Sequence, residues 1–328
     1  MAITLTHLLC AALAVAAAPA SALAPARAGP GASCDRACLE NLVDRYLAAM
    51  IAKDPSGLPL AKNVRFAENH QLLNLGEGSW RTIDGLGTYK HYFADPATGN
   101  VGFIGTVREH GAPGLFDMRL KVEGGKITEI ETFLMRDAGA YQRYEEIGAP
   151  EPVWLETVPP EQRLPREQMI VEVNKYFQGM AHNDGRGDYS FFHPECNRLE
   201  HGLQTTNVKT KEAYGHSTDV QFSAMTCEQQ FKTGFLGFVT EMRDRRFLMV
   251  DEERQVVFAF VTLDHNGTVR ELLQTDGRLF VLPPYFNVPR TLQANEAFKL
   301  KDGKLYRIEM TLTELPYGIR PPWPDTKR

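Results

Sequence analysis

The stretch YLAAMIAKD at residues 46–54 returns as YFQGMAHND at residues 176–184, and in both a tyrosine, a methionine and an aspartate stand four residues apart. Steps of four place the tyrosine and the methionine on one face of an α-helix. Apolar residues at helical spacing precede both stretches. The sequence therefore predicts one helix that begins near Cys34 and ends at Asp54, and a second that opens near Arg166.

Two further motifs recur in the same order. The polar stretch RFAENH (Arg65 to His70) returns as RLEHG (Arg198 to Gly202). LKVEGGKITEIET (Leu120 to Thr132) and FKLKDGKLYRIEMT (Phe298 to Thr311) each read as two strands around a glycine turn. A helix, a polar cluster and a closing hairpin in the same order predict two copies of one domain. The period is too long for a solenoid repeat.

The repeat sets the predicted domain boundaries at residues 34–147 and 166–328. Residues 148–165 are rich in proline and glycine and predict a linker. In the first half, EGSW and GLGTYKHYF predict a loop and a second helix, whereas later alternating stretches predict strands. Residues 267–289 have no counterpart in the first half and predict an inserted excursion that can cap a cavity.

Helices followed by a curved antiparallel sheet predict an α+β fold of two tandem cone-shaped domains. The chain resembles the nuclear transport factor 2-like fold in its SnoaL-like polyketide cyclase branch. The resemblance rests on the long first helix, the acidic loop and the hairpins at Gly125 to Glu131 and Gly303 to Glu309. It implies the fold but no single reaction, because such proteins include isomerases, dehydratases, cyclases, epoxide hydrolases and binding modules.

Composition and the first residues indicate which partners and which cellular location to expect. The chain has 328 residues and a formal net charge of −5 without a basic stripe, which disfavours nucleic acid as a partner. Residues 1–28 contain an apolar run, Leu8 to Ala18, too short to span a bilayer, followed by small residues. They predict a signal peptide and a periplasmic or secreted protein without a membrane span. The alternative is an alanine-rich disordered leader.

Four cysteines remain after this segment: Cys34, Cys38, Cys196 and Cys227. An even number in an exported chain favours disulfides, and three pairings exist. Bridges Cys34–Cys38 and Cys196–Cys227 keep each bridge within one repeat and are the most economical. A zinc site is the alternative, but the spacings match no usual ligand pattern, and we expect no metal.

No phosphate-binding glycine loop and no Gly-x-Ser-x-Gly elbow is present. Acid–base chemistry without a cofactor remains open. The best candidates are Glu200 and His201 as catalytic residues, with Arg198 and Asn207 binding substrate, because a carboxylate beside an imidazole can tune a base toward neutral pH. The alternative is a solvated Arg198–Glu200 ion pair beside a surface histidine.

Three weaker candidates follow. In YGHSTD, His216 is a candidate catalytic residue, and Tyr214 and Asp219 are candidate substrate contacts, although a helical surface pair is as good an interpretation. His265 ends a strand and is a second candidate base, although such a sequence is usually a turn. Arg243 in RDRRF can hold an anionic group, although such a run between strands is more often a solvated turn.

These residues favour an exported, cofactor-independent lyase, hydrolase or isomerase that acts on a small aromatic or apolar ring compound. Analogy with relatives suggests a lignin-derived aryl ether. The second half, which has the denser cluster, is the better candidate for activity. The alternative is a binding module for a small ligand or a protein, and a third interpretation is a subunit of a homodimer or larger homo-oligomer.

Overall fold

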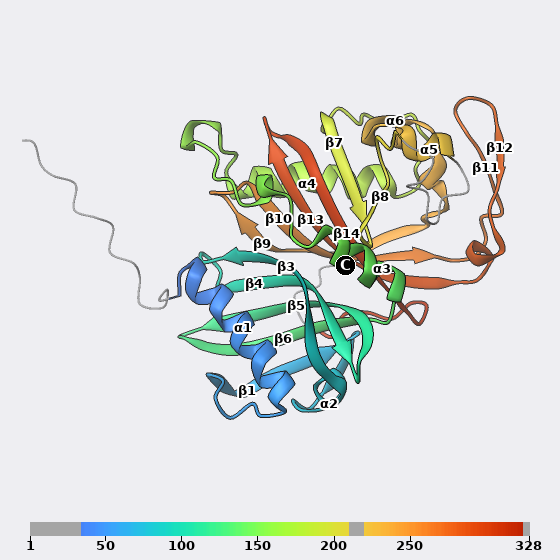
Figure 1. The fold of residues 1–328 in the computed structure, drawn as a ribbon. Helices are drawn as coiled ribbons and strands as arrows, with labels where there is room; N and C mark the ends of the chain where they lie inside the picture. The colour runs from blue at the N-terminus through green and yellow to red at the C-terminus, as the bar shows by residue number, and fades with distance from the viewer. Residues whose placement is uncertain (1–33, 210–219, 324–328) are drawn as a thin grey trace, which may run out of the picture. The chain divides into compact units, whose positions relative to one another are not determined.

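Two six-stranded β-sheets, one from each half of the chain, share one strand order in the computed structural model (Figure 1). The first runs β2-β1-β6-β5-β4-β3 and the second β8-β7-β14-β13-β10-β9. The structure describes residues 34–209 and 220–323, all within one compact unit. The predicted α+β class with two tandem cone-like domains is confirmed. The predicted signal peptide lies outside the described residues.

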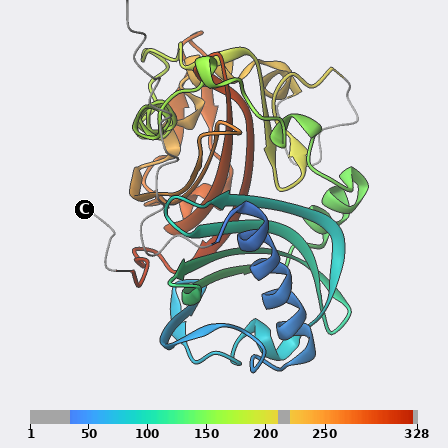
Figure 2. The ribbon, with the colours of Figure 1, turned by 90° about the vertical axis from the view of Figure 1, so that its left-hand side faces the viewer.

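One long helix lies against each sheet, α1 (Arg36–Ala52) in the first half and α4 (Arg166–Met180) in the second (Figures 1 and 2). The side chain of Asp35 begins α1 by accepting a hydrogen bond from the amide of Cys38 at 2.9 Å. Lys53 ends this helix in the left-handed region. The apolar face that includes Tyr46 and Met50 is buried, so the helix predicted from the repeat is confirmed.

The remaining elements follow in chain order. The first half comprises β1 (Leu60–Glu68), β2 (Gln71–Leu73), α2 (Ser79–Thr82), β3 (Ile83–Asp95), β4 (Asn100–Glu109), β5 (Ala112–Glu123), β6 (Lys126–Met135) and α3 (Ala138–Ile147). The segment before α4 contains the short helices η1 (Pro152–Trp154) and η2 (Pro160–Gln162). The second half comprises β7 (Phe192–Glu200), β8 (Leu203–Gln204), α5 (Val220–Ala224), α6 (Cys227–Lys232), η4 (Phe235–Phe238), β9 (Glu241–Asp251), β10 (Val256–His265), β11 (Glu271–Leu273), β12 (Leu279–Val281), η5 (Pro284–Asn287), β13 (Arg290–Lys301) and β14 (Lys304–Leu315).

Both predicted hairpins are present. Strands β5 and β6 pair around Gly124 and Gly125, whose φ angles of +56° and +74° suit glycine. Strands β13 and β14 pair in the same way around Gly303. In each half the closing strand also pairs in parallel with the strand that follows the long helix, β1 in the first half and β7 in the second.

The two sheets contact each other through the faces opposite their long helices. Phe133 of β6 meets Phe260 of β10 edge to face, with ring centroids 5.5 Å apart. Gly102 of β4 lies under Phe258, and a Cβ atom at this glycine would come within 2.5 Å of that ring. The outer faces of both sheets are therefore joined in one apolar core.

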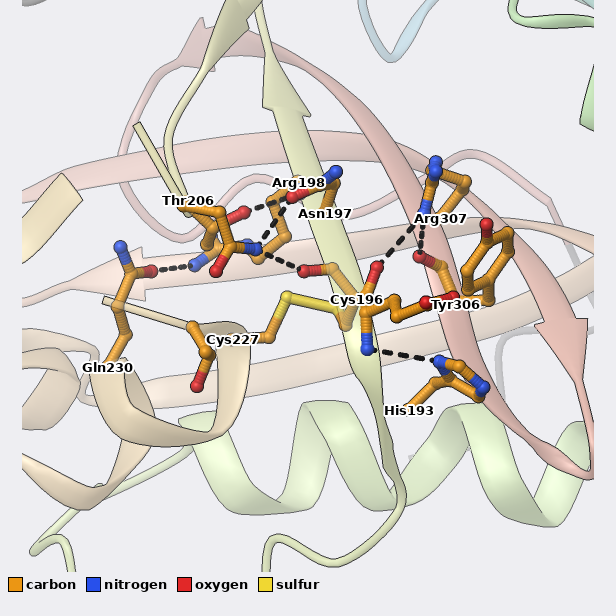
Figure 3. The surroundings of a disulfide bond; sticks show 12 residues. His193, Cys196, Asn197, Arg198, Thr206, Cys227, Gln230, Tyr306 and Arg307 are labelled. Carbon is orange, nitrogen blue, oxygen red and sulfur yellow. Dashed lines mark hydrogen bonds between the residues drawn. A yellow bond between two sulfur atoms is a disulfide. The ribbon is translucent and has the colours of Figure 1, made fainter. Parts of the chain in front are cut away.

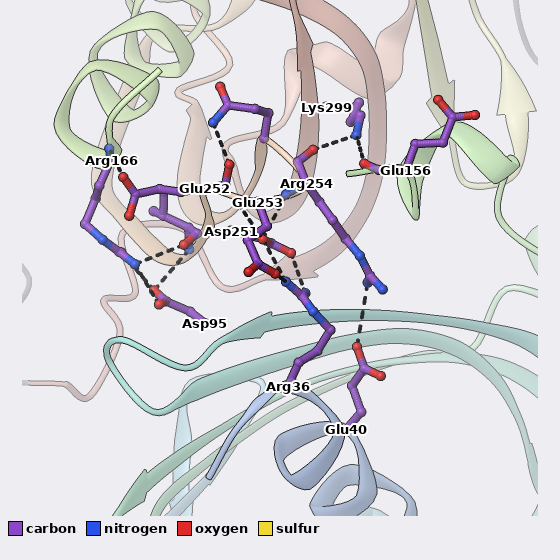
Figure 4. A network of polar contacts seen from close by, with 12 residues as sticks. Arg36, Glu40, Asp95, Glu156, Arg166, Asp251, Glu252, Glu253, Arg254 and Lys299 are labelled. Atoms are coloured by element: carbon purple, nitrogen blue, oxygen red, sulfur yellow. Dashed lines mark hydrogen bonds and ion pairs between the residues drawn. The ribbon is translucent and has the colours of Figure 1, made fainter. Parts of the chain in front are cut away.

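Two ion pairs fasten the halves reciprocally (Figure 4). Arg36, the first residue of α1, donates to Asp251 at the end of β9, with Nη2 2.9 Å from Oδ1. Arg166, the first residue of α4, donates to Asp95 at the end of β3 at 2.6 and 2.8 Å. Each half thus contributes one arginine and one aspartate, the pattern expected of a twofold-symmetric interface.

The disulfides Cys34–Cys38 and Cys196–Cys227 are both present, as predicted. They fit an oxidising compartment outside the cytoplasm. Among the described residues, no helix has the length and apolarity needed to cross a membrane.

Two local predictions are wrong. GLGTYKHYF does not form a loop and a helix, because these residues lie in β3, where alternate side chains such as Tyr89, His91 and Phe93 are buried. RDRRF is not a turn between strands, because Arg243 to Phe247 lie inside β9. In both cases pairing with a neighbouring strand determines the local conformation.

Candidate functional site

A buried polar cluster lies between α4 and the second sheet. Arg198 of β7 is only 4% exposed, and its Nη1 donates to Oε1 of Gln230 in α6 at 3.0 Å (Figure 3). Its Nη2 donates to the carboxylate of Glu200 on the same strand. Tyr176 of α4 and Glu296 of β13 are completely or almost completely buried beside it. We refer to these five residues as the Arg198 cluster.

Three polar atoms of the Arg198 cluster complete no well-formed hydrogen bond among the described residues: Nε of Arg198, the hydroxyl of Tyr176 and Oε1 of Glu296. They lie near one another, because Tyr176 is within side-chain hydrogen-bonding reach of both Glu296 and Arg198. Buried polar groups are usually paired, and an unpaired group costs about 1–3 kcal/mol. Three such atoms in one cluster point to a polar ligand or water that completes their bonding.

Burial also sets the charge of the cluster. Desolvation raises the pKa of Glu296 to about 8, although Arg198 and Tyr176 act to lower it. Glu296 is therefore a neutral carboxylic acid at pH 7 and can donate a hydrogen bond. Desolvation acts to lower the pKa of Arg198, but Glu200 and its neighbours raise it overall, so this side chain stays charged. The cluster thus holds a cation, a neutral acid and a carboxylate that is partly exposed.

The first half lacks this cluster. Corresponding residues of the two halves can be identified from their partners on the closing strands β6 and β14. Ile130 and Ile308 occupy the same position in these two strands, and they pair with Phe66 and Arg198 respectively, so Phe66 corresponds to Arg198. By the same criterion, Met118 occupies the position of Glu296. A second tyrosine at the repeated helix position, Tyr46, accepts a hydrogen bond from Trp80 at 2.7 Å. Both cones have an apolar and aromatic core, but at these two strand positions the first cone has apolar side chains where the second has Arg198 and Glu296.

The disulfide Cys196–Cys227 lies next to the cluster (Figure 3). Cys196 precedes Arg198 on β7 by two residues, and Cys227 begins α6 three residues before Gln230. The bridge ties together the two elements that carry the Arg198–Gln230 hydrogen bond. Thr226 caps α6 with a reciprocal pair of hydrogen bonds to Gln229, which further fixes the start of this short helix.

Comparison with known proteins gives similarities to parts of the chain. A family described as a domain of unknown function, DUF8021, matches residues 162–312. No curated protein matches the chain. An NTF2-like protein of unknown function from Cytophaga hutchinsonii is 17% identical, with a TM-score of 0.24, over 29% of this chain and 88% of its own.

Two further solved structures have similar scores. AclR, a suggested hydroxylase from Streptomyces galilaeus, is 14% identical, with a TM-score of 0.24, over 39% of this chain and 92% of its own. A de novo designed protein with a curved β-sheet is 13% identical, with a TM-score of 0.25, over 46% of this chain and 88% of its own. Each aligned part covers less than half of the present chain.

The residues predicted from the RLEHG motif separate in the structure. Arg198 and Glu200 belong to the buried cluster, whereas His201 turns away from it. Nε2 of His201 accepts a hydrogen bond from the amide of Leu312 at 2.7 Å, and Nδ1 lies 3.5 Å from Oδ2 of Asp137. The pKa of Asp137 is lowered, chiefly by its hydrogen bond with His201. The lone pair that a general base needs is therefore engaged by the backbone.

His201 and Asp137 contribute to the wall of a cleft of about 710 Å³ on another side of β14. Asn207 adopts φ +54° and donates to the carbonyl of Cys196 at 2.8 Å, so its side chain stabilises a turn. His201 and Asn207 thus make structural contacts, and neither forms a hydrogen bond with the Arg198 cluster among the described residues.

His265 and Arg243 lie elsewhere in the second half. His265 is 3% exposed and stacks on Phe238, with ring centroids 5.0 Å apart. Burial lowers its pKa to about 4, so the ring is neutral. Nε of Arg243 donates to Asp264 at 2.7 Å, and its other nitrogens donate to Asp244 and to a backbone carbonyl. Arg243 is thus held by protein groups. Tyr214, His216 and Asp219 lie outside the described residues.

The sequence interpretation missed Tyr176, Glu296 and Gln230 as cluster members, and it assigned Tyr176 only to the apolar face of a helix. Glu296 had a visible signal, since it is an acid at an inward position of a strand whose other inward residues, Ala294 and Phe298 among them, are apolar. Gln230 had none, because only the tertiary structure brings α6 onto β7. The repeated motif aligns Arg198 with Arg65, but the strand pairing shows that Arg198 corresponds to Phe66.

Proposed function

We propose that the second half is a cofactor-independent acid–base enzyme that acts on a small aromatic or apolar ring compound bound at the Arg198 cluster. The supporting observation is the trio of buried polar atoms on Arg198, Tyr176 and Glu296 that complete no well-formed hydrogen bond. The repeat in the first half, with Phe66 and Met118 at two of these positions, folds without them. The polar groups are therefore not required by the fold itself, which favours a functional role.

The residues suit distinct roles. Glu200 has a side chain that is 28% exposed, so it can meet a substrate and accept a proton. Glu296, neutral at pH 7, and the hydroxyl of Tyr176 can donate hydrogen bonds to a developing oxyanion. Arg198 adds a fixed positive charge to the same site. Such a site suits proton abstraction beside a carbonyl, or elimination of an ether or hydroxyl group.

The surroundings favour an aromatic substrate. The ring of Tyr176 lies 5.2 Å from Phe231 and 5.2 Å from Phe298, centroid to centroid. Phe177 and Phe192 extend the same aromatic cluster. These side chains pack on one another in the core of the second half. Aromatic side chains also attract flat rings, and aryl ethers of lignin origin are one class that combines a ring with a leaving oxygen. Export through the predicted signal peptide would bring the enzyme to such compounds.

A pair of matched substitutions tests the proposal. Glu200→Gln removes the base, and Glu68→Gln makes the same change at the corresponding position of the first half. With aryl ethers and ring ketones as a substrate panel, Glu200→Gln is expected to lower turnover by about 10²- to 10⁴-fold, while ligand binding persists and Glu68→Gln has no effect. Ligand binding without turnover in the unaltered protein would instead favour the binding module.

A further inference from the structure

Two buried glutamates at corresponding positions have different partners. Glu131 of β6 pairs with Ala67 and Glu309 of β14 pairs with Leu199 across the repeated parallel ladders. Both carboxylates are 1% exposed, and both point toward the opposite sheet. They therefore offer an internal comparison of how this fold compensates a buried negative charge.

Two guanidinium groups neutralise Glu131. Arg246 donates to both of its oxygens, at 2.7 and 2.8 Å, and Nε of Arg119 lies 3.1 Å from Oε2. Burial acts to raise the pKa of Glu131, but these arginines hold it at about 2. Glu131 is a fully compensated carboxylate of the kind expected in a protein interior.

Glu309 has no lysine or arginine partner within the described part of the chain. Its Oε1 accepts from the hydroxyl of Tyr89 at 2.7 Å, and its Oε2 lies 2.8 Å from Nδ1 of His91. Each carboxylate oxygen retains a lone pair for another donor. The hydroxyl of Tyr144 lies within side-chain hydrogen-bonding reach of Glu309, although it completes no well-formed hydrogen bond. This site is less compensated than its counterpart.

A pocket opens beside Glu309. It has a volume of about 300 Å³ and is bounded by Tyr89, Trp154, Leu199 and the backbone turn at Gly202. Two arginines also border it, and each is paired with a glutamate: Nε of Arg307 donates to Glu151 at 2.9 Å, and Nη2 of Arg198 donates to Glu200. The pocket thus combines a buried carboxylate, two aromatic side chains and apolar surface at a volume that suits a small ligand.

We propose that this pocket binds a small organic cation, an ammonium group carried on a compact apolar or aromatic body. The ammonium group would supply the charge that two arginines supply at Glu131. The faces of Trp154 and Tyr89 would stabilise it further through cation–π contacts. Glu309 projects from the face of β14 opposite to its neighbour Ile308, away from Tyr176 and Glu296 of the Arg198 cluster, although Arg198 itself borders this pocket.

Isothermal titration of the full chain tests this assignment with three probes: 2-phenylethylamine, benzyltrimethylammonium and the neutral isostere 2-phenylethanol. The two cations are expected to bind about tenfold or more tightly than the alcohol. Glu309→Gln retains an acceptor for Tyr89 and should abolish that preference while leaving the affinity for the alcohol unchanged. Equal binding of amine and alcohol, or no binding of either cation, would overturn the proposal.

Two variants keep the test interpretable. Glu146→Gln removes an exposed carboxylate of α3 outside the pocket and should leave the preference for cations intact. If Glu309→Gln does not fold, Trp154→Leu replaces it and must weaken binding of benzyltrimethylammonium more than binding of the alcohol. A preference for cations that survives both pocket variants would show that the ammonium group binds elsewhere.

Discussion

Asp117 and Asn295 occupy the same position in the two repeated hairpins, and their side chains are hydrogen-bonded to each other, with Nδ2 of Asn295 2.7 Å from Oδ2 of Asp117. A residue that contacts its own counterpart lies on a twofold axis. Together with the reciprocal Arg36–Asp251 and Arg166–Asp95 ion pairs, this contact shows that the two halves meet as the subunits of a symmetric dimer would. The sheet face that each half could use to pair with a second domain is covered by the other half of the same chain.

Asp117 should make stability depend on pH. Burial raises its pKa to about 7, although hydrogen bonds from Thr311 and Asn295 act to lower it. The folded state therefore binds a proton that the unfolded state releases near pH 4, so the stability linked to this group is present at low pH and is lost as the pH rises toward 7. Asp117→Asn should flatten this decline, which urea unfolding between pH 4 and 8 will measure.

The opposite change at the corresponding residue of the second half is the control for this prediction. Asn295→Asp places two carboxylates against each other on the axis, and like charges at such a distance disfavour ionisation. The free energy of unfolding should then fall more steeply with pH than in the unaltered protein. A flat profile in both the unaltered protein and this variant would show that Asp117 is not the titrating group.

Copying the first cone into the second should separate stability from function. Arg198→Phe with Glu296→Met installs the residues that stand at the corresponding positions, Phe66 and Met118. Replacing buried charged groups with apolar ones is often neutral or stabilising by about 1–4 kcal/mol. We expect the double variant to be at least as stable as the unaltered protein in urea unfolding and to lose turnover and ligand binding.

The reverse change in the first cone controls for the cost of burying an isolated charge. Phe66→Arg would place a guanidinium among apolar side chains without a designed acceptor, at a cost of several kcal/mol. A double variant of the second cone that proves as damaging as Phe66→Arg would indicate that the Arg198 cluster serves stability alone.

The repeated features were visible in the sequence because they depend on local rules. Helical spacing predicts α1 and α4, and glycine turns predict the two hairpins. The order of these elements was enough to predict two tandem domains. The disulfides followed from the same repeat, because each bridge lies within one half.

The site was visible only in part. Arg198 and Glu200 stand two residues apart on one strand, so their shared face follows from the period of a strand. Asp137, the partner of His201, lies far away in sequence, and no local pattern joins them. The sequence motif aligns Arg198 with Arg65, but the strand pairing aligns it with Phe66. Neighbouring residues of a strand face opposite sides of the sheet, so Arg65 lies on the other face from the true counterpart of Arg198.

The two disulfides should contribute unequally. Cys196–Cys227 spans 31 residues and Cys34–Cys38 only 4. Chain-entropy arguments assign about 3–4 kcal/mol to the longer loop and about 2 kcal/mol to the shorter one. Replacing Cys196 and Cys227 by serine should therefore lower the free energy of unfolding more than replacing Cys34 and Cys38.

The longer bridge should also affect the site. Without it, α6 is free to move from β7, and the hydrogen bond between Arg198 and Gln230 should weaken. Ligand affinity at the Arg198 cluster should fall in the Cys196→Ser/Cys227→Ser variant and stay unchanged in the Cys34→Ser/Cys38→Ser variant. Equal affinity in both variants would mean that the bridge stabilises the fold without positioning the cluster.

The reciprocal ion pairs should differ in strength despite their symmetry. Each aspartate keeps two hydrogen bonds from backbone amides when its arginine is removed, Asp95 from Thr98 and Val250 and Asp251 from Glu253 and Arg254. The two differ in burial, because the side chain of Asp95 is 1% exposed and that of Asp251 is 7% exposed. We expect a loss of about 3 kcal/mol for Arg166→Ala and about 1–2 kcal/mol for Arg36→Ala. Urea unfolding at neutral pH measures both.

A double-mutant cycle isolates the cause. If the unpaired charge of Asp95 accounts for the loss, Arg166→Ala combined with Asp95→Ala should be less destabilised than the sum of the two single variants. The Arg36–Asp251 cycle should give a smaller coupling energy, since its aspartate is 7% exposed whereas Asp95 is 1% exposed. Equal coupling energies would show that burial of the aspartate does not determine the strength of these contacts.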